Sequence, residues 1–389
     1  MFRTWFFTEM PYPSTPPPDA YDSVRVTLPN AHCDPEELRR LYDLYFDLYR
    51  ACDSLGLDIM LNEHHQTATC LDVAVPLSMA IIARETTTSR ILALGNPIAN
   101  RADPIRVAEE MAMVDVLSGG RIEVGFVRGV PQEVSATNVS PVGMYERFWE
   151  AADLIVRAWT SHDGPFSWEG DYFHHRQVNI WPRPYQQPHP PLWVPTQSAS
   201  TAAAVARRGY CLGTILAGVK GARELFEVYR STSVEAGLGP AAPERLGYCA
   251  LVFVGATESA ARSGAEELDW YLKNNKVANQ FNLPPGYLPA AARAEALRRL
   301  AHGEEIGSPI AHLATASIDQ LAEEGFFFFG TPDQVVDQIT SFHDAVGGFG
   351  NLLLMGHGGH MDYDTTVGSL ELYAREVQPR LRAAFDGLG

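Results

Sequence analysis

Short apolar runs alternate along the chain with longer segments in which apolar residues recur every three or four positions. This alternation is typical of a parallel sheet built from β/α units. We count eight strand candidates, at residues 4–8, 57–62, 91–95, 122–127, 192–196, 211–215, 246–254 and 351–355. Eight strands in this order favour an α/β fold of the (β/α)8 TIM-barrel type over an open doubly wound sheet. No G-x-G-x-x-G follows the first strand, as a dinucleotide-binding sheet would require.

Local signals mark where the helices between these strands begin and end. Asp34 and Pro35 predict a helix start, and Gly56 predicts the end of that helix. Pro104 opens a helix whose apolar residues follow i, i+3, i+4, i+7 spacing through residue 117. The remaining helices are predicted at residues 145–160, 201–208, 221–236, 260–274, 332–345 and 370–385.

Three stretches fit neither the strands nor the helices of a minimal barrel. Residues 9–33 are rich in proline, residues 162–191 predict a hairpin before the fifth strand, and residues 275–324 form a long, partly helical excursion. We interpret the chain, residues 1–389, as one barrel domain with these three insertions at its C-terminal face. Insertions there usually form lids and substrate walls, so we expect residues 275–324 to act as a mobile lid.

The charge balance narrows the classes of partner. The chain has 389 residues with 30 Lys and Arg against 47 Asp and Glu, a net charge of −17. That argues against binding nucleic acid or an anionic membrane surface, both of which need basic patches. An anionic cofactor remains compatible, because a few arginines and backbone N–H groups can hold one phosphate. Five scattered cysteines and the absence of a run of about 20 apolar residues predict free thiols in a soluble, cytoplasmic protein.

Polar and special residues cluster just after four successive predicted strands, where barrel active sites are built. They are Glu63, His64 and His65 after the second strand, Gly95 and Asn96 after the third, Arg128 after the fourth, and Gln197, Ser198 and Thr201 after the fifth. A single such residue would be weak evidence for a site. Four strand ends together predict one.

Arg128 and the Ser198–Thr201 run together predict a phosphate site. A guanidinium can bind two phosphate oxygens, and hydroxyls with unpaired N–H groups at a helix start attract anions. Serine and threonine also begin many helices as ordinary caps, so only the pairing with Arg128 favours phosphate. Gly95 allows backbone to approach a flat ring, and Asn96 offers both a donor and an acceptor, although this segment alone could be an ordinary turn.

Several motifs, in order along nearly the whole chain, resemble the bacterial-luciferase-like flavin-dependent monooxygenases. The most specific are residues 103–121, running into Gly125 and Arg128-Gly129, and the Glu63-His64-His65 triplet. Residues 197–201, 181–193, 329–332 and 374–379 add to the likeness.

The resemblance implies a barrel that binds reduced FMN from a separate flavin reductase. The flavin then reacts with O2 to form a C4a-hydroperoxide, which oxygenates a small organic substrate. His64 matches the family's active-site histidine, a candidate acid, base or peroxide stabiliser. Cofactor contacts are expected from Glu63, Gly95, Asn96, Arg128, Tyr145, Gln197, Ser198 and Thr201. The family often has a non-prolyl cis peptide at the Gly95–Asn96 strand end, and a homodimer packed through barrel helices is expected.

The sequence departs from bacterial luciferase at two positions, and three alternatives to the monooxygenase interpretation stay open. Gln197 replaces an acidic residue of bacterial luciferase and Val127 a cysteine, which argues against light emission and long-chain aldehyde oxidation. One alternative is a deazaflavin-dependent hydride-transfer enzyme of the same fold. A second is a metal-dependent barrel hydrolase using His64, His65, His357 and His360. The third is a non-catalytic subunit. The substrate and the type of oxygenation are not determined by these patterns.

Overall fold

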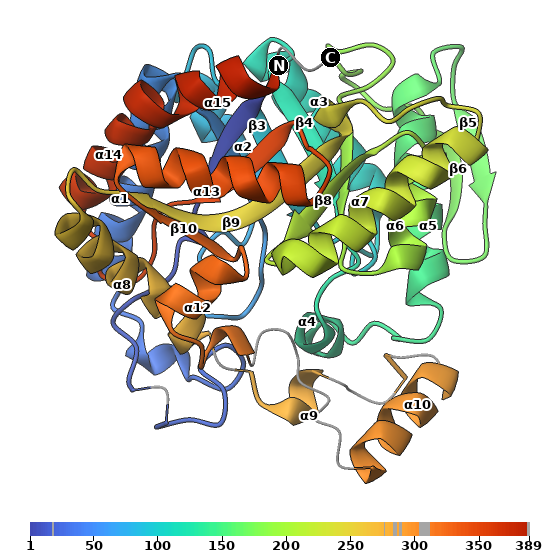
Figure 1. Cartoon of the computed structure of the whole chain (residues 1–389). Helices are drawn as coiled ribbons and strands as arrows, with labels where there is room; N and C mark the ends of the chain where they lie inside the picture. The colour runs from blue at the N-terminus through green and yellow to red at the C-terminus, as the bar shows by residue number, and fades with distance from the viewer. Residues whose placement is uncertain (18, 276, 283–285, 288–289, 303–311, 387–389) are drawn as a thin grey trace.

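In the computed structural model, which describes residues 1–17, 19–275, 277–282, 286–287, 290–302 and 312–386, a parallel sheet closes on itself. Its neighbouring strands are, in order, β1 (Arg3–Phe7), β2 (Asp58–Leu61), β3 (Ile91–Asn96), β4 (Ile122–Phe126), β7 (Leu192–Pro195), β8 (Cys211–Ile215), β9 (Leu246–Val254) and β11 (Asn351–Met355). β11 pairs in parallel with both β9 and β1, which completes the ring. The predicted (β/α)8 barrel is confirmed (Figure 1).

A ninth strand, β10 (Phe327–Gly330), is absent from the predicted set. It pairs in parallel with residues 251–254 of β9, beyond the register 246–249 in which β9 pairs with β8. β9 has nine residues whereas β8 has five, so the end of β9 extends past its first partner. β10 pairs with this unpaired edge of β9. Its place in the sheet therefore depends on the difference in length between β8 and β9.

The predicted helix boundaries hold where a local cap defines them. α1 (Pro35–Leu55) begins at Asp34, whose side chain accepts the Glu36 N–H, and ends at Gly56 with φ +69°. α3 (Pro104–Ser118) likewise begins at a capping aspartate, Asp103, and ends at a left-handed glycine, Gly119. Glycine ends each of these two helices because the residue there adopts a left-handed backbone conformation, which glycine takes up without steric cost.

The other helices lie within a few residues of the predictions, except that the helical segment predicted at 370–385 already begins at Tyr363. They are α5 (Met144–Thr160), α6 (Ala199–Arg207), α7 (Gly218–Glu235), α8 (Glu258–Asn274), α13 (Pro332–Ala345), α14 (Tyr363–Leu372), a π-helical turn (Tyr373–Val377) and α15 (Gln378–Phe385). No helix was predicted where α2 (Val75–Glu85) and the short α4 (Pro131–Ala136) lie. α6 begins two residues before the predicted Thr201, which therefore lies in its first turn.

The second insertion forms the predicted hairpin, with β5 (Phe166–Glu169) antiparallel to β6 (His174–Val178). It packs on α5, where Glu150 accepts the Trp168 indole N–H and three backbone N–H groups of residues 171–173. This hairpin lies beside an outer helix (Figure 1) and not over the strand ends, so it is not placed as a substrate wall.

The first and third insertions lie at the strand ends. The first carries a 3-10 turn (Asn30–His32), and the third carries α9 (Asn279–Asn282), α10 (Ala290–Ala301) and α12 (Ile318–Glu323). In Figure 1, α4, α9 and α10 lie at the end of the barrel away from the N-terminus. Residues 283–285, 288–289 and 303–311 of the third insertion are outside the described residues, so its role as a lid stays a prediction.

Alternate strand residues fill two separate layers of core. Trp5 and Phe7 of β1 point into the barrel with Leu92, Trp193 and Leu353, whereas neighbouring strand residues such as Phe6 pack outward against the helices. Trp5 and Trp193 meet edge to face inside the barrel with ring centroids 6.2 Å apart. Large side chains thus close the barrel interior, which leaves the strand ends for chemistry.

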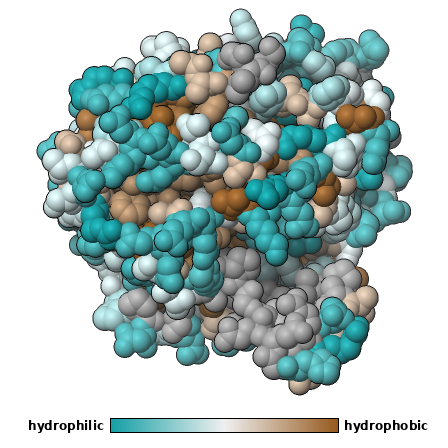
Figure 2. Space-filling model, viewed as in Figure 1, coloured by the Kyte–Doolittle hydropathy of each residue, from teal (hydrophilic) through white to brown (hydrophobic). Residues whose placement is uncertain are grey.

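One face of the molecule can be followed by the hydropathy of its residues. The face in Figure 2 is mostly hydrophilic, with apolar residues scattered among polar ones. No helix in the described part of the chain is long and apolar enough to cross a membrane. All five cysteines are free, four of them buried, as the scattered spacing predicted.

Candidate active site at the strand ends

Glu63, at the end of β2, is the centre of a buried charged network. Its Oε1 accepts from Arg101 Nη2 at 2.5 Å and lies 2.8 Å from His65 Nε2, while its Oε2 accepts the Val75 N–H at 3.0 Å. The Glu63 side chain is fully buried. The hydrogen bond to Glu63 raises the pKa of His65, with burial acting against it. Both carboxylate oxygens of Glu63 thus have protein partners.

His64 has a different carboxylate partner. Its Nδ1 lies 2.8 Å from Oε1 of Glu133, a buried residue of α4. The same oxygen accepts the backbone N–H of His65 at 3.1 Å. His64 and Glu133 are 69 positions apart, and no local signal in the sequence pairs them.

The end of β3 presents a carboxamide without a partner. Asn96 is fully buried, and neither its Oδ1 nor its Nδ2 has a hydrogen-bond partner. The peptide between Leu94 and Gly95 is cis. A Cβ on Gly95 would lie 2.2 Å from Cγ1 of Val127, the residue after β4, so packing against Val127 is what requires glycine here.

A second unpartnered carboxamide, missed by the sequence analysis, follows four residues later. Both polar side-chain atoms of Asn100 are buried without a partner. Its side chain lies against Gly129, where a Cβ would be 2.5 Å from Asn100 Nδ2 and where φ is +96°. Arg147 of α5 fixes the backbone on both sides of Asn100, because it donates to the carbonyls of Ala99 and Arg101 at 2.9 Å each. Arg147 therefore fixes the backbone around Asn100, while the side-chain amide of Asn100 has no hydrogen-bond partner.

Arg128, the predicted phosphate ligand, contacts the third insertion. Its Nη2 donates to the hydroxyl of Tyr287 at 2.9 Å, and its guanidinium carbon lies 4.7 Å from the centroid of the Tyr287 ring. The Tyr287 hydroxyl in turn donates to the Gly129 carbonyl at 3.2 Å. No sequence motif indicated this tyrosine, since the contact spans 159 positions.

The start of α6 follows β7, the neighbour in the sheet of the strand that precedes Arg128. β4 and β7 are adjacent, with Gly125 opposite Trp193, so the segments that follow them leave the barrel at the same edge. Ser198 precedes α6 but makes no side-chain cap bond; its hydroxyl lies 2.9 Å from that of Ser200. The first intrahelical bond runs from Ala202 N–H to Ser198 O, so the N–H groups of Ala199, Ser200 and Thr201 precede it.

Two further predicted residues lie at the margin of this edge. Gln197 is exposed and donates from Nε2 to the Ile215 carbonyl at 2.9 Å, which links the ends of β7 and β8. Tyr145, in the first turn of α5, is 37% exposed and packs edge to face on Trp149. The segments that carry Arg128 and the α6 start therefore follow neighbouring strands, whereas Tyr145 lies on α5 and packs on Trp149.

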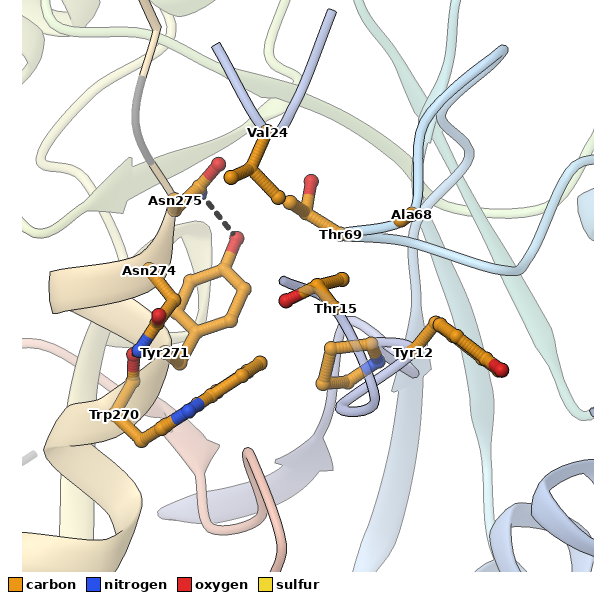
Figure 3. Close-up of a pocket in the computed structure, with 10 residues that line it drawn as sticks. Tyr12, Thr15, Val24, Ala68, Thr69, Trp270, Tyr271, Asn274 and Asn275 are labelled. Atoms are coloured by element: carbon orange, nitrogen blue, oxygen red, sulfur yellow. Dashed lines mark hydrogen bonds between the residues drawn. The ribbon is translucent and has the colours of Figure 1, made fainter. Parts of the chain in front are cut away.

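The first insertion and the end of α8 meet over the ends of β1 and β2. Arg25 forms an ion pair with Glu9 at 3.7 Å and donates to Asn275 Oδ1 at 2.9 Å. Asn275 also donates to the Tyr271 hydroxyl at 2.8 Å, drawn in Figure 3. Tyr271 and Asn275 line a cavity of only about 10 Å³, room for a single water. Burial raises the pKa of Tyr271 well above its usual range.

The histidines proposed as metal ligands have other partners. His357 is buried, its Nδ1 lies 2.7 Å from Thr366 Oγ1, and burial lowers its pKa to about 4. His360 packs edge to face on Trp270. Within the described residues, no group of three or more His, Cys, Asp or Glu is arranged to hold a metal ion. The metal-hydrolase alternative therefore loses the ligand set that it required.

Comparison with known proteins shows the family of this chain. The model of the luciferase-like monooxygenase family matches residues 32–347. The chain belongs to this family. It is 29% identical over 165 residues to the oxygenase component of a flavin-dependent trigonelline monooxygenase from Acinetobacter baylyi, covering 41% of this chain and 45% of the relative. It is 26% identical over 354 residues to 4-hydroxyprotoasukamycin monooxygenase from Streptomyces nodosus subsp. asukaensis, covering 86% of each. The chain spans about half the length of the first curated relatives that it matches.

Solved structures share the fold of this family member. The oxygenating constituent of 3,6-diketocamphane monooxygenase from Pseudomonas putida, in complex with FMN, superposes with a TM-score of 0.71 at 20% identity, covering 98% of each chain. An F420-dependent secondary alcohol dehydrogenase gives 0.65 at 17% identity, covering 86% of this chain and 93% of the other. At these identities the likeness shows the fold alone.

The residues present fit a flavin phosphate ester. Two buried carboxamides without partners, Asn96 and Asn100, call for a ligand that both donates and accepts hydrogen bonds. Arg128 and the α6 start together offer positive potential for a phosphate. The polar edge of a flavin ring, its hydroxylated side chain and its phosphate have these complementary groups.

Proposed function

We propose that this protein is an FMN-dependent monooxygenase that uses reduced FMN and O2 to oxygenate a small organic substrate. The observation that carries the proposal is the unpartnered, fully buried carboxamide of Asn96 at the end of β3. Leaving such a group without hydrogen bonds costs about 1–3 kcal/mol. Its position, between the strand end that carries His64 and the one that carries Arg128, suits a flat ring whose phosphate extends toward α6.

Each predicted cofactor residue has a role in this arrangement. Asn96 and the backbone at Gly95 would hold the ring, and Arg128 with Ser198 and Thr201 would hold the phosphate. Glu63 orients Arg101 and His65 behind the site, Gln197 joins two strand ends, and Tyr145 stays an expected contact. When bound, reduced FMN supplies the electrons that activate O2; the protein binds it, orients it and keeps water out.

Anaerobic titration of the protein with reduced FMN, followed by an O2 pulse, tests the proposal. We expect saturable binding and a transient flavin absorbance that belongs to neither reduced nor oxidised FMN. The same titration with Asn96→Leu should lose binding. Tight flavin binding without any transient would favour a non-catalytic subunit.

A hydride-transfer enzyme that uses a deazaflavin is the second candidate. F420-dependent enzymes share the barrel, so the fold admits both chemistries. Titrating the protein in parallel with reduced FMN and reduced F420 separates them. Preference for F420, with no oxygen-dependent transient, would replace our proposal.

His64 is the proposed acid or base of the reaction. His64→Ala should bind FMN nearly as wild type does, because the phosphate and ring contacts remain. The flavin transient should then decay faster and release hydrogen peroxide. An unchanged transient would remove His64 from the mechanism.

A separate flavin reductase and a second copy of this chain are the proposed protein partners. The relative from Acinetobacter baylyi is described as an oxygenase component, which supports supply of reduced FMN by another protein. Leu77 of α2 is 65% exposed and Met113 of α3 is 56% exposed, and these two helices pack side by side. A homodimer formed through these two helices would bury both exposed apolar side chains. Sedimentation measurements of wild type and Leu77→Glu can test it. Free thiols throughout favour a cytoplasmic location.

A further inference from the structure

The contact between His64 and Glu133 determines which nitrogen of the histidine ring carries the proton. Nδ1 of His64 and Oε1 of Glu133 are 2.8 Å apart, and the Glu133 side chain is only 3% exposed. Little water competes for the contact. Burial alone would raise the pKa of Glu133, but the hydrogen bond and charge of His64, the His65 N–H and the charge of Arg25 lower it below its usual value.

An ionised carboxylate can only accept hydrogen bonds, so the donor in this contact is Nδ1 of His64. In the neutral ring the other nitrogen, Nε2, then carries a lone pair. The Oε1 atom is held in place from a second direction by the backbone N–H of His65, at 3.1 Å. The ring is therefore restrained both in its orientation and in its tautomer.

The backbone of Glu133 is fixed as firmly as its side chain. Pro131 opens α4, and the Glu133 N–H donates to the Val130 carbonyl at 3.1 Å. The Glu133 carbonyl accepts the Thr137 hydroxyl at 2.8 Å and the Thr137 N–H at 2.9 Å. Glu133 follows Arg128, the proposed phosphate ligand, by five residues. The same short segment therefore carries both Arg128 and the carboxylate that contacts His64.

We infer that Glu133 is a positioning residue that holds His64 as the Nδ1–H tautomer, so that Nε2 is the nitrogen available to take up a proton. The reaction in which His64 takes part rests on the proposed function; the tautomer does not. A carboxylate behind a histidine fixes orientation and increases the basicity of the far nitrogen, as carboxylates do behind metal-bound and catalytic histidines.

Nitrogen-15 NMR of the histidine-labelled protein reads the tautomer without any cofactor or substrate. The His64 signals, assigned by their loss in His64→Gln, should show a protonated Nδ1 and an unprotonated Nε2 at a pH where the ring is neutral. Glu133→Ala should convert most of the population to the Nε2–H form. Glu133→Gln keeps an acceptor oxygen and should retain much of the Nδ1–H form, which guards against a variant that fails to fold. Glu146→Ala, an exposed acid on α5, should leave the signals unchanged.

The flavin transient gives an independent readout. Glu133→Ala should shorten its lifetime about 10- to 100-fold, the loss typical of removing the carboxylate behind a functional histidine. In the double variant with His64→Ala the loss should equal that of His64→Ala alone, because Glu133 acts only through His64. The FMN dissociation constant should stay within about twofold.

Two results would overturn the inference: an unchanged His64 tautomer in a folded Glu133→Ala protein, or additive effects of the two substitutions. Failure of the proposed function looks different. In that case the NMR shift on Glu133→Ala would still occur, while no flavin transient would form in wild type.

Discussion

The guanidinium of Arg128 lies against Tyr287, with its carbon 4.7 Å from the ring centroid and its Nη2 2.9 Å from the hydroxyl oxygen. The Tyr287 hydroxyl also bonds to the carbonyl of Gly129, the residue after Arg128. A side chain of the third insertion thus orients the arginine that we assign to the cofactor phosphate. Arg128 is pre-organised at one edge of the site, which reduces the entropy lost on binding.

Arg128→Ala should weaken FMN binding about 10- to 100-fold, since a charge-assisted hydrogen bond contributes roughly 1.5–3 kcal/mol. Riboflavin, which lacks the phosphate, should bind wild type and variant alike. Fluorescence titrations with both flavins measure the ratio. Arg176→Ala, on the hairpin and with a side chain 90% exposed, is the matched control. An equal loss for both flavins would place Arg128 at the ring and not at the phosphate.

Asn96→Leu should separate stability from binding. The wild-type carboxamide is buried without partners, so an apolar side chain of similar size should leave the ligand-free protein as stable or more stable. Binding of FMN and of riboflavin should both weaken at least about tenfold, because the lost contact is to the ring they share. Thermal unfolding and flavin titration are the two measurements. A destabilised variant with normal flavin affinity would show that Asn96 serves the fold alone.

Arg121 ends the motif at residues 103–121 that resembles the family. Its replacement tests whether that end of the motif stabilises the fold or binds the cofactor. Its donors reach the carbonyls of Ala83, Thr86, Ser89 and Ser118 and the Thr86 hydroxyl, at 2.7–3.1 Å. Lysine cannot reproduce this forked set. Arg121→Lys should lower the free energy of unfolding by about 2–4 kcal/mol, measured in denaturant, while the folded variant binds FMN normally. Reduced affinity at unchanged stability would instead put Arg121 in the site.

Asp72 should make stability depend on pH. Burial raises its pKa to about 7, with nearby Glu63 adding to the shift and the Ser78 hydroxyl opposing it. The unfolded carboxyl titrates near pH 4, so between about pH 4 and 7 the folded state holds the extra proton. This contribution to stability is therefore present at low pH and is lost as the pH rises through 7. The unfolding free energy of Asp72→Asn relative to wild type should increase by a few kcal/mol from pH 4 to pH 8. A difference that does not change with pH would contradict the shift.

Much of the candidate site follows from residues placed at strand ends, because every parallel strand of a barrel ends at the same face. His64, Asn96, Arg128 and the α6 start each end or follow such a strand, so the sequence alone predicts that they lie at one edge. The cofactor contact expected of Glu63 stays a prediction, while nothing in the sequence indicated that its oxygens bond to Arg101, His65 and Val75. A carboxylate's partners depend on which side chains approach it in space.

The pattern of residues along the chain was enough to predict the barrel, the limits of α1 and the edge at which polar residues gather. Asp34 and Gly56 act through bonds and backbone angles within their own helix, so a local pattern suffices to predict them. In contrast, the pairing of β10 with the free end of β9 and the contact of Glu133 with His64 arise only when the chain is folded. The same holds for the Asn100 side chain, which lies without a partner beside Gly129. These contacts join segments far apart in the chain, and their energies depend on burial and distance, which no spacing along the sequence encodes.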